Sequence, residues 1–184
     1  VKYKYPVALN YEDVDLVSID FEKINELSIV GNESSRRLGV LKSLLFSMEY
    51  YVLENTFNLY IIDDVNRQLK DFKEKMYTEE YTLDYSRIGE IIIDLEEKFE
   101  ERYNLLLQNE GGEKIRMPLQ IVVINSKEAI EYISSNKQIL ERYNKLVKQY
   151  KALGISFIYS NIEDVNVPYG APEILKRQKE NKKV

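Results

Sequence analysis

Short apolar, β-branched runs alternate along this chain with longer stretches in which apolar residues recur every three or four positions. The short runs have the length and composition of buried strands, and the longer stretches are typical of amphipathic helices. Such alternation indicates βαβ units, and therefore an α/β fold with a mostly parallel sheet and helices on both faces. The expected strands are Leu27–Val30, Phe57–Ile62, Leu119–Ile124 and Ile155–Ser160.

Three apolar stripes predict the main helices. We expect the first helix to run over residues 36–53 with Ser34 or Ser35 as its N-cap. We expect the second to end near residue 108 and the third to be closed by Gly154. The stripes run over Leu38–Val52, Ile88–Leu106 and Ile139–Leu153.

Other segments are shorter or harder to assign. Pro6–Tyr11 and Asp15–Phe21 precede the alternating region and indicate a small N-terminal β-ribbon. Asp64–Glu74 is predicted to be a short polar helix, whereas the Tyr- and Glu-rich segment Met76–Ser86 shows no clear period.

Composition excludes many kinds of active site. The 184 residues include no Cys and no His, which excludes disulfides, thiolate or imidazole metal sites and Ser-His-Asp triads. Lys and Arg number 26 and Asp and Glu 31, giving a net charge of −5, so the bulk charge offers no reason to expect nucleic acid. No apolar run has the length of a membrane span. Because the first residue is Val, we expect the chain to be a piece of a longer protein.

A buried strand, a glycine turn and an amphipathic helix form the setting of a phosphate-binding loop. Its nucleotide-binding form reads G-x-x-x-x-G-K-[ST]. Of that pattern only the opening glycine is kept, because two arginines and a leucine replace the second glycine, the lysine and the hydroxyl residue. The eight residues in register are Gly31, Asn32, Glu33, Ser34, Ser35, Arg36, Arg37 and Leu38.

Each replacement weakens the case for Mg-ATP. A side chain hinders the close approach of backbone to phosphate, and Leu38 has no hydroxyl to bind Mg²⁺. On these residues alone, an ordinary strand-to-helix turn is a better interpretation than ATP hydrolysis. Arg36 and Arg37 lie at a helix N-terminus, where a cation costs about 0.3–1 kcal/mol. We expect the nearby Glu33 carboxylate to pair with these two arginines. The alternative is that they bind an anion or an acidic partner.

Further motifs, in order along the chain, resemble the FtsK/SpoIIIE-type P-loop ATPases over nearly its whole length. Tyr60–Asp63 is similar to the family's Y-x-x-D strand end, and Glu100–Leu106 to its E-x-R-Y-x-x-L helix end. Within the family the chain is most similar to the last ATPase domain of the type VII secretion ATPases of the EssC/YukBA (EccC-like) kind. The resemblance implies a three-layer P-loop NTPase (RecA/FtsK-like) fold over residues 1–172, followed by a basic tail over 173–184.

The resemblance also implies that the catalytic residues have been replaced. The family's P-x-x-V-V-I-D-E strand corresponds to Pro118–Ser126, so Asn125 stands at the Mg²⁺-associated Asp and Ser126 at the water-activating Glu. Asn161 stands at the γ-phosphate-sensing Gln. Phosphoryl transfer depends on positioning and charge stabilisation, so these losses should abolish it. Asn125 is also placed to cap the following helix, whatever its ancestry.

From this resemblance we expect a non-hydrolysing cytoplasmic domain of a bacterial cell-membrane protein, acting in substrate recruitment and regulation of export. Expected partners are WXG-family substrates, through a C-terminal signal helix in an apolar groove, and neighbouring ATPase domains, with a homo-oligomer left open. We expect no cofactor, with weak ATP and Mg²⁺ binding left open, and no nucleic acid.

Two alternatives remain at the level of sequence. One is an active or slow motor of the translocase type. The other is a structural or regulatory ring module, in which Arg102 or Arg116 acts in trans at an interface with a neighbouring domain.

Overall fold

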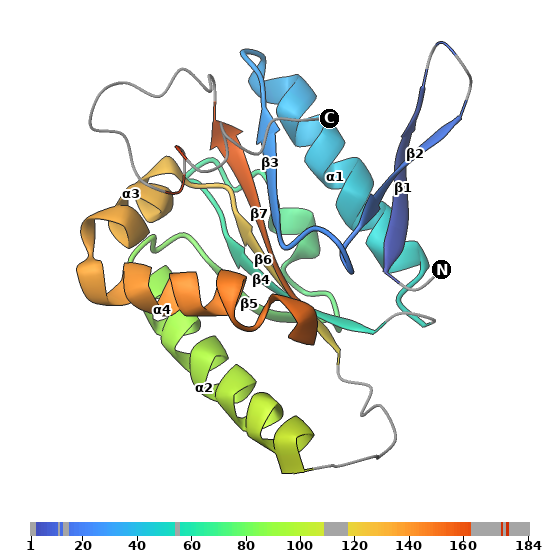
Figure 1. The fold of residues 1–184 in the computed structure, drawn as a ribbon. Coiled ribbons are helices and arrows are strands. Elements are labelled where there is room, and N and C mark those ends of the chain that lie inside the picture. The colour runs from blue at the N-terminus through green and yellow to red at the C-terminus, as the bar shows by residue number, and fades with distance from the viewer. Residues whose placement is uncertain are drawn as a thin grey trace.

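The computed structural model describes residues 3–10, 12, 15–53, 56–108, 118–162, 174 and 176. Within them, five strands form one parallel sheet in the order β3-β7-β6-β4-β5 (Figure 1). All four strands expected from the sequence are present, and β5 is added at one edge. The strands are β3 Glu26–Val30, β4 Phe57–Ile62, β5 Thr78–Thr82, β6 Leu119–Ile124 and β7 Ile155–Ile162.

Helices cover both faces of this sheet, which confirms the expected three-layer α/β architecture (Figure 1). Helix α1 (Ser34–Tyr50) packs on one face. The opposite face carries α2, α3 and α4. These three helices span Arg87–Gln108, Lys127–Ser135 and Lys137–Lys148.

The strand order places the carboxyl ends of β3, β7 and β6 next to one another. After β3 the chain turns to α1 on one face, whereas after β6 it turns to α3 on the other. In open α/β sheets ligands bind where the chain leaves neighbouring strand ends toward opposite faces. The fold therefore directs attention to the carboxyl edge around the end of β3.

The N-terminal ribbon packs against α1. Strands β1 (Lys4–Leu9) and β2 (Leu16–Asp20) pair antiparallel, as expected from the sequence. Tyr5 anchors the ribbon: it is fully buried, with ring centroids 5.9 Å from Phe21 and 6.4 Å from Tyr51. Burial of these rings ties the ribbon to the main body.

A buried ion cluster joins α2 to α4 on the opposite face. Glu96 accepts a hydrogen bond from Lys145 Nζ at 2.6 Å and another from Arg142. Burial alone would raise the pKa of Glu96, but the two cations together outweigh it and lower that pKa. The carboxylate is thus held charged between the two helices.

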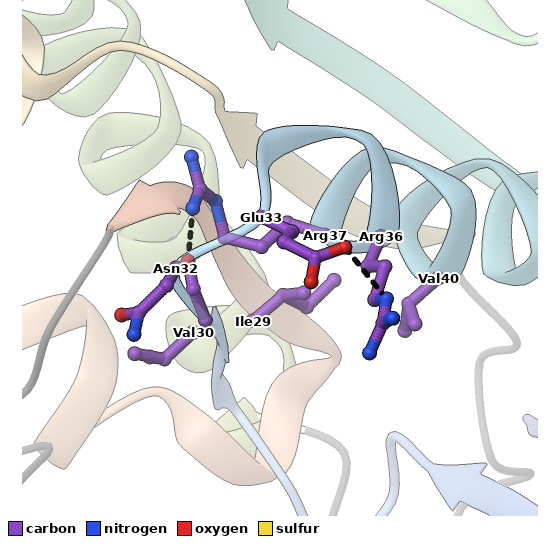
Figure 2. A pocket seen from close by; sticks show the side chains of 8 residues that line it. Ile29, Val30, Asn32, Glu33, Arg36, Arg37 and Val40 are labelled. Atoms are coloured by element: carbon purple, nitrogen blue, oxygen red, sulfur yellow. Dashed lines mark hydrogen bonds and ion pairs between the residues drawn. The ribbon is translucent and has the colours of Figure 1, made fainter.

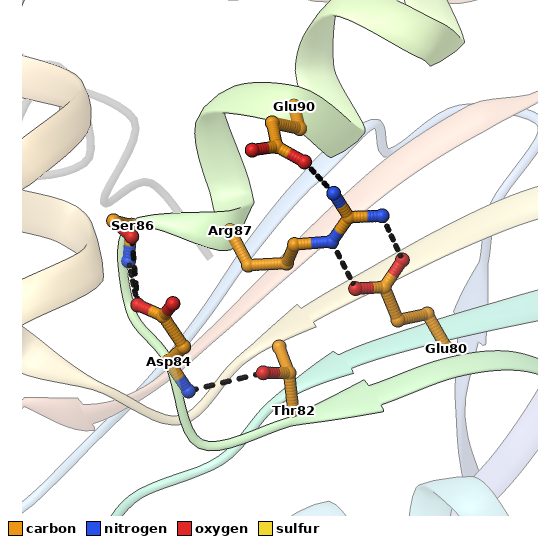
Figure 3. A network of polar contacts seen from close by, with 6 residues as sticks. All are labelled: Glu80, Thr82, Asp84, Ser86, Arg87 and Glu90. Atoms are coloured by element: carbon orange, nitrogen blue, oxygen red, sulfur yellow. Dashed lines mark hydrogen bonds and ion pairs between the residues drawn. The ribbon is translucent and has the colours of Figure 1, made fainter.

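The start of α2 is fixed by a separate polar network (Figure 3). The Asp84 carboxylate accepts hydrogen bonds from both the backbone N and the hydroxyl of Ser86, which lower its pKa. Arg87 donates Nε to Glu80 Oε1 at 2.7 Å and also pairs with Glu90. The first turn of α2 is therefore connected directly to β5.

Two expectations about local structure were wrong. Asp64–Glu74 contains only the 3₁₀ turn Lys70–Phe72, because the Asp64 side chain accepts from the Asn66 backbone and holds a turn. The N-cap of α1 is Glu33, not Ser34 or Ser35.

Two further elements, β5 and α3, were not predicted from the sequence. Met76–Ser86 contains β5, an edge strand whose half-exposed, charged residues hide the period of two. The segment after β6 holds two helices, since Asn136 caps α4 by accepting from Ile139 N at 3.3 Å. As expected, Gly154 closes the helical region before β7, with a φ of 91°.

Two expectations fall largely or wholly outside the described residues. Arg116 lies outside them, and of the basic tail only Ile174 and Lys176 are described. Ile174 is fully buried in the core on the side of α2 and α4. The boundary between 172 and 173 stays a prediction.

Candidate functional site

A pocket of about 360 Å³ lies at the carboxyl end of β3, where the sequence predicts a degenerate phosphate loop (Figure 2). Its walls combine the end of β3 with the first turns of α1. Five of the eight predicted loop residues line it, whereas Ser34, Ser35 and Leu38 do not. The lining residues are Ile29, Val30, Gly31, Asn32, Glu33, Arg36, Arg37 and Val40.

Arg37 turns back onto its own loop. Its guanidinium Nη1 donates to the backbone carbonyl of Gly31, and the residue is only 5% exposed. A lysine at this position in a phosphate loop would instead extend its charge toward phosphate. The Gly31 carbonyl oxygen therefore occupies the position beside the Arg37 guanidinium where a bound anion would lie.

Arg36 points the other way, as Figure 2 shows. Its Nε lies 2.7 Å from Glu33 Oε2, with both side chains largely exposed. This contact confirms the pairing of Arg36 with Glu33 expected from the sequence. Glu33 caps α1 through its backbone only, since its carbonyl accepts from the backbone N of Arg36 and Arg37 at 3.1 Å each.

Gly31 does not use the conformational freedom of glycine. The only glycine with positive φ among the described residues is Gly154. A Cβ built on Gly31 would lie 3.7 Å from Arg37 Cγ, which is ordinary van der Waals contact. The loop therefore lacks the close-approach geometry for which a phosphate cradle needs glycine.

A second polar group lies at the ends of β4 and β6. Asp63 and Asn125 are each about 1% exposed, and Asn125 Nδ2 donates to Asp63 Oδ1 at 2.9 Å. The same Nδ2 donates to Gln68 Oε1 at 3.1 Å. Asn125, which the resemblance predicts at the Mg²⁺-associated position, thus acts here as a hydrogen-bond donor.

Both carboxylate oxygens of Asp63 accept hydrogen bonds from groups of the chain itself. Besides Asn125, its two oxygens accept from the backbone N of Asp64 and Leu69 and from the hydroxyl of Tyr81, at 2.8–2.9 Å. Burial and the Asp63 carboxylate raise the pKa of Tyr81, so this phenol stays protonated and remains a donor. We refer to Asp63, Gln68, Tyr81 and Asn125 as the Asp63 cluster.

These residues do not fit a magnesium ion. Mg²⁺ requires oxygen ligands, whereas Asn125 directs its NH₂ group at Asp63. No group of three or more acidic side chains that could hold a metal occurs in the part of the chain that the structure describes. No step of metal-assisted phosphoryl transfer can be derived from this arrangement.

The remaining predicted site residues have structural surroundings. Ser126 caps α3, its Oγ accepting from Ala129 N at 3.2 Å, so the cap expected of Asn125 falls to its neighbour. Asn161 has a φ of 63° at a bulge of β7 opposite β3 and does not line the pocket. Arg102 is a buried residue of α2. The roles predicted for Asn161 and Arg102 stay predictions.

Sequence reasoning named Asp63 only as a strand end and missed Gln68 and Tyr81. One signal was available: polar residues follow directly after the apolar strands Phe57–Ile62 and Leu119–Ile124. Parallel neighbours bring such strand ends together. The contribution of Tyr81 could not be found, because its strand was not recognised.

Comparisons with known proteins agree on the fold. No protein-family model and no curated protein sequence matches the chain. Two solved structures are the cytoplasmic domain of EssC, with a TM-score of 0.73 and 18% identity, and EssC (ATPases 2 and 3) from Geobacillus thermodenitrificans, with 0.76 and 17%. Each match covers 98% of this chain.

A third solved structure is Thermomonospora curvata EccC (ATPases 2 and 3) in complex with a signal sequence peptide. Its TM-score is 0.71 at 14% identity over 97% of this chain. This chain has the fold of the EssC and EccC ATPase domains. It covers only 35%, 32% and 32% of the lengths of these three chains.

The pCW3 conjugation coupling protein TcpA, solved with ATPgS, has the same fold at a TM-score of 0.68 and 17% identity. The fold expected from the sequence resemblance is therefore confirmed. Within the described residues, no helix is long and apolar enough to span a membrane.

Proposed function

We propose that this chain is a degenerate, non-hydrolysing ATPase domain of a type VII secretion ATPase. The observation that carries the proposal is the closure of the phosphate loop by its own residues: Arg37 binds the Gly31 carbonyl and Arg36 binds Glu33. An incoming phosphate would have to displace both contacts and would approach the Glu33 carboxylate. The fold shared with EssC and EccC supports this choice of family.

The Asp63 cluster supports the same proposal. An ATPase of this fold needs an oxygen ligand for Mg²⁺ beside its phosphate loop. Here the corresponding position is an amide whose NH₂ group is committed to Asp63 and Gln68. The side chains at two separate parts of the proposed ATPase site are thus engaged in contacts within the chain, which supports the absence of hydrolysis.

We propose further that the domain recruits export substrates and helps to regulate export. One structural neighbour, EccC, was solved with a signal sequence peptide, which supports a peptide partner for this fold. The partner we propose is the C-terminal signal helix of WXG-family proteins, bound through apolar anchors about one helical turn apart. The parent would be a bacterial cell-membrane protein with this domain on the cytoplasmic side.

The test is a pair of assays on the 184-residue chain. Fluorescence anisotropy with labelled C-terminal peptides of candidate substrates should show saturable binding, and a peptide with its apolar anchors changed to Ser should not bind. Release of phosphate from Mg-ATP should not exceed that of a heat-denatured sample. Turnover would support the alternative of an active or slow motor, whereas absence of both activities would support a structural or regulatory ring module.

A further inference from the structure

Lys98 of α2 lies beside a polar group near the amino ends of β4 and β6. Gln120, the second residue of β6, is fully buried, and its Oε1 lies 3.3 Å from Lys98 Nζ. The Tyr60 hydroxyl at 3.3 Å and Asn58 Nδ2 at 3.4 Å approach the same oxygen. A carbonyl oxygen has two lone pairs, so these three donors compete for it. Lys98 therefore shares its acceptor with two other donors.

A second cation lies one helical turn further along α2. Arg102 is 6% exposed, and among the described residues its Nη1 is buried without a hydrogen-bond partner. Its guanidinium lies 4.6 Å from the centroid of the Phe99 ring. Side chains four positions apart on a helix are neighbours, so two positive charges are held together at the edge of the core. Loss of a proton from one of them would remove this repulsion, and only the lysine can lose it.

The charges around Lys98 come from three elements. Burial and the charge of Arg102 lower the pKa of Lys98, against the opposing effect of Glu79 on β5. Tyr60 of β4 adds no negative charge near neutral pH, because burial and nearby carboxylates, those of Glu79 and Asp94 among them, raise its pKa to about 12. The balance is a lowered pKa for Lys98. A larger share of Lys98 than of an ordinary lysine is therefore the neutral amine at neutral pH.

The surroundings of Lys98 are those that make a lysine reactive. The neutral amine is a nucleophile, and the two features that activate lysines for covalent chemistry are desolvation and a neighbouring cation. Lys98 has both. It is also half-buried rather than buried, so a small electrophile can approach it from solvent.

We propose that Lys98 is a site of Nε-acylation by small acyl phosphates and that Arg102 activates it. Nζ attacks the acyl carbon, the new C–N bond forms as the C–O bond to phosphate breaks, and phosphate leaves with the electron pair. Nζ releases one proton to solvent. The product removes one of the two cations and adds a carbonyl acceptor beside competing donors. The inference is independent of the proposed function, since it requires neither a nucleotide nor a peptide partner.

The experiment treats the folded 184-residue chain with acetyl phosphate and follows the initial acetylation rate of each lysine by peptide mass spectrometry. Near neutral pH, Lys98 should react at least about threefold faster than Lys127 and Lys137, two largely exposed lysines of α3 and α4. Its rate should also reach half of its maximum at a lower pH than theirs, because a shift of one pKa unit changes the neutral fraction about tenfold.

Two variants should change the Lys98 rate in opposite directions. Arg102→Gln removes the neighbouring cation and should slow Lys98 by about threefold or more, whereas Glu79→Gln removes the opposing anion and should accelerate it. Arg142→Gln is the matched control, because it removes a guanidinium of α4 that pairs with Glu96. It should leave the Lys98 rate unchanged. Circular dichroism of each variant checks that it is folded.

A Lys98 rate no higher than those of Lys127 and Lys137 would overturn the proposal, as would equal midpoints in the pH profiles. A Lys98 rate that Arg102→Gln leaves unchanged would overturn the activation by Arg102. If Arg102→Gln does not fold, the pH profile and Glu79→Gln still decide, since this exposed edge-strand position is far less sensitive to substitution. Failure of Glu79→Gln to accelerate Lys98 would then count against the proposal.

Discussion

Polar groups at the carboxyl ends of the strands (the carboxyl edge) and at their amino ends (the amino edge) have opposite surroundings. At the carboxyl edge, Arg37, Arg36 and Asp63 are all paired within the chain. At the amino edge, Arg102 Nη1 is buried without a hydrogen-bond partner among the described residues, whereas Lys98 is influenced by the charge of Glu79, which raises its pKa against the effects of burial and of Arg102. This difference supports the proposal that the domain does not use a phosphate ligand at the place where its fold would hold one.

The largest expected effect comes from Asp63→Ala at the carboxyl edge. The change would leave the donors of Leu69, Tyr81 and Asn125 buried without an acceptor. We expect a loss of about 3–5 kcal/mol in the free energy of unfolding, as for other broken buried charge networks. Urea denaturation of the 184-residue chain would measure it. A loss below about 1 kcal/mol would mean that the cluster does not hold this edge together.

Asn125→Asp tests whether the amide has replaced a metal ligand. The new carboxylate would face Asp63 and could not donate to it, so we expect a loss of about 2 kcal/mol at pH 7. The loss in the free energy of unfolding should shrink as pH falls toward 5, because one of the two adjacent carboxylates then takes up a proton and can donate to the other. Asn125→Ala is the control, and its loss should not depend on pH in this range. Rescue of Asn125→Asp by millimolar Mg²⁺ would show instead that the site still accommodates the ion.

Arg37→Met should have a smaller effect on the same edge. It removes the hydrogen bond to the Gly31 carbonyl while keeping much of the buried side chain, so we expect a loss of about 1 kcal/mol. Arg36→Met removes an exposed ion pair and should cost less than about 0.5 kcal/mol. Equal losses in thermal denaturation would contradict the different environments assigned to the two arginines.

The smallest effect should come from Arg102→Met at the amino edge. Replacing an uncompensated buried cation by an apolar side chain of similar length should leave stability unchanged or raise it by about 1 kcal/mol. The comparison of the two edges predicts this reversal of sign relative to Asp63→Ala. Destabilisation by more than about 1 kcal/mol in urea would show that Arg102 is already satisfied inside the isolated chain.

Much of the fold could be predicted from the sequence, because buried parallel strands and amphipathic helices leave clear patterns. Strands such as Leu119–Ile124 are apolar throughout, and the stripe around Phe99 has the helical period. Edge strand β5 could not be predicted, since one side of it is exposed and its residues are charged. The division between α3 and α4 depends on one cap, at Asn136, inside an otherwise helical pattern.

The candidate site was predicted only in outline. The sequence placed the loop residues from Gly31 to Arg37 and marked Asn125 as altered. It could not show that Arg37 bends back to Gly31, because that contact depends on the rotamer of a long side chain. Contacts such as those of Asn125 with Asp63 and of Lys98 with Gln120 join residues far apart in the chain. Only the strand order brings them together.

Closure of the phosphate loop by Arg37 and Glu33 should leave no place for nucleotide. Isothermal titration of the 184-residue chain with ATP and Mg²⁺ tests this closure. We expect no saturable heat up to millimolar nucleotide. Binding in the micromolar range that is abolished by Arg37→Ala would contradict it, because Arg37 would then hold phosphate rather than the carbonyl of Gly31.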